Sequence, residues 1–209
     1  MKSVLSIILL SIMSLAAPGT DQIVKEFDAV AGGLLQIDLE TGGEVEITGW
    51  DRNQVRVEAE ARGRDQAPGI TINRTDRGVE VKVEFPENRR RDFKGQHTQR
   101  VHIVVKVPLR FDLQVESMGG DITIDGVEGD IEGETMGGEL RLSHLKGDLE
   151  ISTMGGGITL TDSDVDGKVS TMGGPVLLEN VTGDVDGSSM GGSVIYKNVR
   201  RADGSSTGA

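Results

Sequence analysis

The chain has 209 residues, and its 34 acidic against 22 basic residues give a formal net charge of −12. It contains 30 glycines, few aromatic residues and no cysteine, which excludes disulfides, thiolate zinc sites and cysteine nucleophiles and requires an aliphatic core. The acidic balance argues against general nucleic-acid binding, which needs a basic surface.

The N-terminal residues 1–19 have the pattern of a signal peptide. Lys2 is followed by an apolar run over 4–15 and then by Ala16-Ala17. A basic start, a short apolar stretch and small residues are typical of secretory signals, and the run is too short to span a bilayer comfortably. We therefore predict an exported protein, periplasmic or extracellular, whose mature chain has no transmembrane span. An uncleaved N-terminal anchor is the alternative.

Residues 20–116 predict irregular β coils. Apolar and polar residues alternate with a period of two, and no stretch after residue 21 has the period of a helix. The expected strands lie at 23–27, 34–39, 44–47, 55–61, 70–73, 79–85, 101–107 and 111–116. Trp50 stands at a corner between two of them, where we expect it to cap the core rather than to offer a platform for a sugar.

The segment 86–98 is the one long loop that the pattern predicts. It carries Arg89, Arg90, Arg91 and Lys94 in an otherwise acidic chain. The loop is either simply solvated or a binding site for an anionic glycan, a lipid head group or an acidic protein partner.

The sequence Met-Gly-Gly recurs every 18 residues from residue 117 onward, and a Ser or Thr precedes it each time. The methionines are Met118, Met136, Met154, Met172 and Met190. Two short stretches of alternating apolar and polar residues follow each glycine pair. This pattern indicates two short strands and two tight corners per repeat. Glycine permits corner conformations that other residues avoid. The sequence therefore predicts an all-β, single-chain β-solenoid, like a parallel β-helix. Its regular repeats span 117–203, and a disordered tail follows at 204–209.

One repeat carries a possible calcium motif. Asp162, Asp164 and Asp166 alternate before Gly167, as in the first half of a calcium-binding loop. The twelfth residue counted from Asp162 is Gly173, where an EF-hand loop has Glu, so the segment is not an EF-hand. The hypotheses are a calcium site, which would be the chain's only cofactor, and an Asp-rich turn. The sequence Val-x-Gly, which marks a second corner in the repeats, also comes two residues late here, at Val165–Gly167. This delay predicts a bulged corner.

The direction of the methionine side chains is ambiguous in the sequence. Counting alternate residues forward from Leu149 places Met154 outside, whereas counting back from Ile158 places it inside. Three interpretations remain, namely a buried ladder, an exposed apolar stripe for a partner, and a track for a soft metal such as Cu(I). Since methionine is adaptable and usually buried, we expect a ladder in the core.

Two stretches of the chain resemble a known family. The segment 42–61, which contains Thr-Gly-Trp-Asp-Arg-Asn-Gln-Val-Arg-Val-Glu-Ala, is similar to the opening of bacterial adhesin-like domains of unknown function. Val107-Pro108-Leu109, followed by Leu113-x-Val115 and the Gly-rich repeats, resembles their second half. The resemblance covers about 22–200. It implies a β-solenoid fold and surface adhesion, and it transfers no catalytic residues.

These observations predict a non-enzymatic, exported, adhesin-like binding module of the bacterial cell envelope, with an envelope glycan or protein as its partner. The alternative is a regulatory or stress-related envelope protein that binds a membrane partner through the basic loop. A polysaccharide-acting solenoid enzyme is less favoured, because no repeat carries an insertion that could wall a pocket. None of the three histidines stands in a recognisable catalytic spacing with Ser or Asp.

Overall fold

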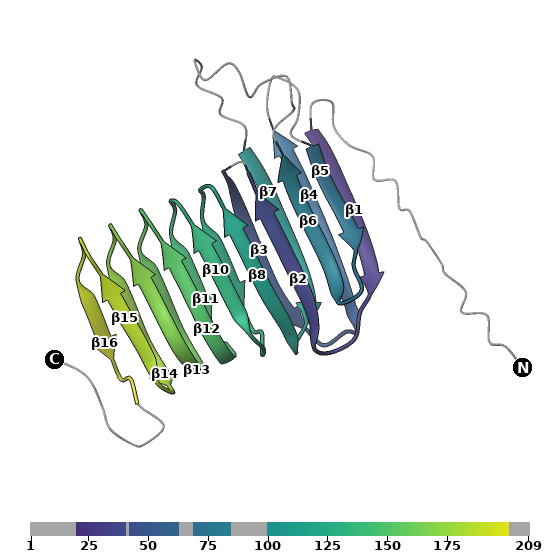
Figure 1. Cartoon of the computed structure of the whole chain (residues 1–209). Coiled ribbons are helices and arrows are strands. Elements are labelled where there is room, and N and C mark those ends of the chain that lie inside the picture. The colour runs from purple at the N-terminus through teal and green to yellow at the C-terminus, as the bar shows by residue number, and fades with distance from the viewer. Residues whose placement is uncertain (1–19, 41, 63–68, 85–99, 201–209) are drawn as a thin grey trace, which may run out of the picture.

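The computed structural model describes residues 20–40, 42–62, 69–84 and 100–200, which form strands and turns without a helix (Figure 1). The predicted all-β class is therefore confirmed. Since the described part lacks helices, it contains none that could cross a membrane. The signal segment 1–19, the residues Arg89, Arg90, Arg91 and Lys94, and the tail 204–209 lie outside the described residues.

The regular part pairs each strand in parallel with the strand one repeat further along. Leu140 lies opposite Ile158, and Ile151 lies opposite Val169, so partners are 18 residues apart. The strands are β9 (Ile122–Asp125), β10 (Ile131–Thr135), β11 (Leu140–Ser143), β12 (Lys146–Thr153), β13 (Ile158–Thr171), β14 (Val176–Thr182), β15 (Val185–Ser189) and β16 (Val194–Lys197). Neighbouring strands are about 4.8 Å apart, and this distance is the rise of one repeat.

Two layers of strands enclose the core. One contains β9, β11, the first half of β13, β14 and β16, and the other contains β10, β12, the second half of β13 and β15. Alternate residues of each layer are buried, and the core is almost wholly Val, Leu and Ile, as the composition predicts. At the C-terminal end the Tyr196 hydroxyl accepts the Gly187 N–H at 3.0 Å and donates to the Gly187 carbonyl at 3.2 Å. These hydrogen bonds connect β16 of one layer to β15 of the other.

The corner that contains Asp162 keeps the 18-residue register, so the predicted bulge is wrong. Asp164 pairs with Lys146 in the preceding repeat and with Thr182 in the following one. Ser163 takes the interior place that Leu145 has one repeat earlier. Its hydroxyl accepts the Leu145 N–H at 3.0 Å and donates to the Thr161 carbonyl at 2.7 Å. Because both hydrogen-bonding functions are satisfied, a polar side chain fits inside without an extra residue.

The N-terminal strands do not wind as successive coils, contrary to the prediction for 20–116. They are β1 (Thr20–Asp28), β2 (Gly33–Leu39), β3 (Gly43–Trp50), β4 (Gln54–Arg62), β5 (Gly69–Arg74), β6 (Gly78–Glu84), β7 (Arg100–Pro108) and β8 (Phe111–Ser117). β4 runs antiparallel to both β1 and β7, and β5 runs antiparallel to β6. Successive coils of a solenoid would run parallel.

Strands β2 and β3 continue the two layers beyond β8 and β9. Leu35 pairs with Leu113 of β8, and Val45 pairs with Ile122 of β9. The chain then adds β4 to β7 on the far side of β2 and β3, so that the antiparallel strands end the stack at the N-terminal side (Figure 1). The order in space therefore differs from the order in the sequence.

Candidate functional site

The five methionines of the repeat point outward, so the expected buried ladder is wrong. The exposed fractions are 59 % for Met118, 49 % for Met136, 46 % for Met154, 54 % for Met172 and 83 % for Met190. We call these five side chains the methionine row. They make up most of the large hydrophobic side chains that are exposed in the described part of the chain.

The corner itself explains why methionine lies outside. The residue before the methionine is buried in the first four repeats and half-buried in the fifth. In the second repeat the Thr135 hydroxyl donates to the Gly137 carbonyl at 2.6 Å and accepts the Gly137 N–H at 3.3 Å. With Thr135 inside, the adjacent Met136 must face outward. Gly138 then has a φ of +100°, which is not an extended conformation. Counting alternate residues backward through this corner therefore loses the phase, and the forward count is correct.

Backbone hydrogen bonds hold the methionine row in register. The Met136 N–H donates to the Ser117 carbonyl at 3.1 Å, and the Met154 N–H donates to the Thr135 carbonyl at 3.0 Å. The same bond recurs at Met172 and at Met190, each at 3.1 Å. Consecutive methionines therefore start from backbone positions about one strand spacing, 4.8 Å, apart.

The calcium prediction concerns Asp162, Asp164 and Asp166, all of which lie in the described part of the chain. All three lie within β13, but Asp162 stands at a corner with a φ of +49°, and Asp164 and Asp166 follow it in the paired part of the strand. The Asp162 Oδ1 accepts a hydrogen bond from the Asn180 amide at 2.9 Å, and the Asp166 Oδ1 accepts the Asp184 N–H at 2.6 Å. The carboxylates of Asp162 and Asp166 thus reach along the stack to the next repeat.

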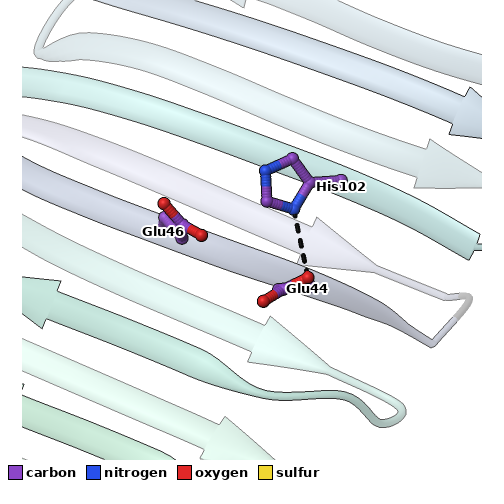
Figure 2. Close-up of side chains that lie close together, drawn as sticks. All are labelled: Glu44, Glu46 and His102. Atoms are coloured by element: carbon purple, nitrogen blue, oxygen red, sulfur yellow. Dashed lines mark ion pairs between the residues drawn. The ribbon is translucent and has the colours of Figure 1, made fainter.

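A different group of potential metal ligands lies near the N-terminal end. Glu44 of β3 lies opposite His102 of β7 in the parallel register, and Glu46 follows on the same outward face (Figure 2). The His102 Nδ1 is 3.3 Å from a Glu44 carboxylate oxygen. One ligand atom from each of the three residues lies within 4.8 Å of the others.

An imidazole with two carboxylates could hold a borderline divalent cation such as Zn²⁺. The three side chains are exposed or half-exposed, so a cation would reach them directly from solvent. Sequence reasoning missed this group because the three strands β4, β5 and β6 separate β3 from β7 in the chain. Only the register between β3 and β7 brings the residues together.

Asp125, Ser143 and His144 also meet, at one corner of the repeats. The Ser143 hydroxyl and the His144 Nδ1 each lie 2.7 Å from the same Asp125 Oδ1. The hydrogen bond from His144, and then that from Ser143, lowers the pKa of Asp125, and the same Asp125 contact raises the pKa of His144. Because the serine contacts the aspartate and not the imidazole, this is not the relay that activates a serine nucleophile.

Trp50 does not cap the core, contrary to the expectation. Its indole N–H donates to the Gln54 carbonyl at 2.7 Å, and the ring is half-buried at the end of β3. The Arg52 guanidinium lies 4.9 Å from the ring centroid, and the Lys106 ammonium lies 5.9 Å from it. The ring therefore makes cation–π contacts on the outside of the sheet.

The outward surface of β8, β10, β12 and the second half of β13 is strongly acidic. Two shallow depressions cross it, and Glu132 and Glu150 line both. We call this surface the acidic face, and its polar lining residues are Gln114, Glu116, Asp130, Glu132, Glu134, Asp148, Glu150, Ser152, Asp166 and Lys168. Because partners are 18 residues apart, equivalent residues form straight rows along the stack, in which Glu132 lies beside Glu150 and Glu116 beside Glu134.

Comparison with solved structures finds similar chains at low sequence identity. A proposed cell adhesion protein from Clostridium sporogenes is 10 % identical, with a TM-score of 0.40 over 85 % of this chain and 99 % of that one. Proposed adhesins from Bacteroides fragilis and Parabacteroides merdae are 14 % and 13 % identical, with TM-scores of 0.34 and 0.32. They are matched over 85 % and 86 % of this chain and over 97 % and 91 % of their own.

No curated protein matches the chain. A sequence model of the Toastrack DUF4097 family matches residues 34–207, which is most of the length. The resemblance to bacterial adhesin-like domains of unknown function is thereby confirmed, and the protein belongs to the Toastrack DUF4097 family.

Proposed function

We propose that the protein is a non-enzymatic, exported, adhesin-like binding module of the bacterial cell envelope, built as a β-solenoid of 18-residue coils. The acidic face carries this proposal, because it presents rows of carboxylates on a nearly flat surface rather than a deep pocket. A flat, periodic surface suits an extended polymer that makes the same contact at several repeats. It does not suit a small molecule, which needs a concave site.

The chemistry of the acidic face indicates the class of ligand. Glu132, Glu134 and Glu150 are exposed, and ionised carboxylates are strong hydrogen-bond acceptors. Hydroxyl groups of a neutral glycan can donate to them. Phosphate- or sulfate-bearing polymers would be repelled by the same rows, and the net charge of −12 adds to this repulsion. The proposed ligand is therefore a neutral, hydroxyl-rich envelope glycan.

The binding test compares neutral polysaccharides, such as mannan and dextran, with dextran sulfate on the immobilised protein. We expect neutral glycans to bind and the sulfated polymer not to bind. Glu132→Ala with Glu150→Ala should weaken binding about tenfold or more, since each change removes charge-assisted hydrogen bonds. The matched control is Thr159→Ala on the outward surface of the other sheet layer, which should bind like the wild type. Equal binding by all variants, or binding of the sulfated polymer alone, would contradict the proposal.

Export is tested separately by mass spectrometry of the N-terminus in fractionated cells. We expect the mature chain to begin between Ala16 and Asp21, in the periplasmic or extracellular fraction. An intact N-terminus in the cytosol would contradict export. The regulatory alternative depends on Arg89, Arg90, Arg91 and Lys94, which lie outside the described residues, so no contact in the structure favours it.

A further inference from the structure

We propose that the methionine row binds Cu(I), with each ion held between the thioether sulfurs of methionines in neighbouring repeats. Thioethers are soft ligands that select Cu(I) over hard cations. The chain has no cysteine, so methionine sulfur is its only soft donor. The five methionines that follow the segment 1–19 are collected in one row instead of being dispersed through the core.

The exposure of the row shows that these side chains are not required for packing. Met136, Met154 and Met172 are about half exposed, while the neighbouring Thr135, Thr153 and Thr171 are buried and hydrogen-bonded in the corner. A large apolar side chain on a surface normally costs solubility. Metal coordination accounts both for the exposed position and for the use of methionine at all five repeats.

The spacing of the row matches the coordination geometry. Two sulfurs on opposite sides of one ion, each at a metal–sulfur distance of about 2.3 Å, are about 4.6 Å apart. The strand spacing that separates consecutive methionines is about 4.8 Å. The three rotatable bonds of each methionine side chain can absorb the small difference. Methionines two repeats apart are separated by about 9.6 Å and are much less suited to sharing an ion.

The surroundings favour a cation. Exposed Glu116 and Glu134 each stand two residues before a methionine of the row. Their carboxylates, together with the negative charge of the whole chain, raise the local concentration of cations. The row is also separate in sequence from Glu44, Glu46 and His102, whose oxygen and nitrogen donors suit divalent ions instead.

The test uses two double variants that keep the same number of methionines. Met136→Leu with Met172→Leu leaves Met118, Met154 and Met190, none of which are neighbours. Met118→Leu with Met190→Leu leaves three consecutive methionines. Leucine preserves size and apolar character, and exposed positions tolerate such changes, so both variants should fold, which a urea unfolding curve verifies.

Cu(I) is titrated anaerobically into each protein in competition with a colorimetric chelator, with ascorbate as the reductant. We expect the variant without neighbouring methionines to bind Cu(I) about tenfold or more weakly than the wild type. The variant with three consecutive methionines should stay within about threefold. X-ray absorption of the bound copper should show sulfur neighbours at about 2.3 Å. Equal affinity of the two variants, a copper site with nitrogen neighbours only, or no Cu(I) binding by the wild type would overturn the proposal.

Discussion

Replacing either of two adjacent glycines in one corner with alanine should have very different effects on stability. At Gly138 the φ is +100°, and an added Cβ would overlap the Gly120 carbonyl of the preceding repeat. The unfavourable φ costs about 1–3 kcal/mol, and displacing packed backbone costs about as much again. Gly138→Ala should therefore lower the free energy of unfolding by about 2–6 kcal/mol. At Gly137 the Cβ would meet no atom within 4 Å, so Gly137→Ala should change stability by less than about 1 kcal/mol.

Equilibrium unfolding in urea, followed by far-ultraviolet circular dichroism, measures both variants against the wild type. The linear extrapolation gives the free energies, and an unchanged slope shows that the comparison is valid. Because the two substitutions are chemically identical and one residue apart, propensity and the unfolded state contribute almost equally to both. A difference below about 1 kcal/mol between them would refute the corner geometry derived from the stacking of Gly138 on Gly120.

Three further outcomes are expected. Thr135→Val should cost about 1–3 kcal/mol in the same assay, because the half-buried Gly137 amide and carbonyl lose the Thr135 hydroxyl as their partner. Thr135→Ser keeps the hydroxyl and should therefore be much less destabilising. Met154→Ala should change stability by less than about 0.5 kcal/mol, and peptide mapping should find Met154 rapidly oxidised by dilute peroxide in the folded protein; slow oxidation would contradict its exposure. The raised pKa of His144 means that its contribution to stability is present in acid and is lost as pH rises through the His144 pKa. The lowered pKa of Asp125 means that its contribution is lost as pH falls through the Asp125 pKa. The pair should therefore stabilise the protein at pH values between the pKa of Asp125 and the pKa of His144. NMR titration of His144 checks its pKa, and melting curves of wild type and His144→Asn at several pH values check the stabilisation. A His144 pKa at or below its ordinary value would contradict the contact.

The sequence by itself determined the β class, the 18-residue spacing and the family. These features are local or strictly periodic. A repeat such as Met136-Gly137-Gly138 marks its own corner, and the same sequence signal returns in each copy. Alternation within a single strand likewise identifies buried residues such as Leu140 and Leu142 without knowledge of the partner strand.

Only the tertiary structure decided which way the methionines face, because alternation fails where the chain is not extended. The backward count from Ile158 passes through a glycine corner and reverses its phase, and the inward hydroxyl of Thr153 then fixes Met154 outside. The same limit applies to Asp162–Asp166. The spacing of its aspartates fits a loop, but Asp162 lies at a corner, whereas Asp164 and Asp166 are paired with neighbouring repeats.

The order of the N-terminal strands also depended on tertiary structure. Val45 pairs with Ile122 on one side and with Ile103 on the other, although neither partner is close to it in the chain. Such pairings carry no local sequence signal, because any strand with a matching apolar face can supply the hydrogen bonds. The group of Glu44, Glu46 and His102 exists only through that register, which is the physical reason why the sequence alone could not predict it.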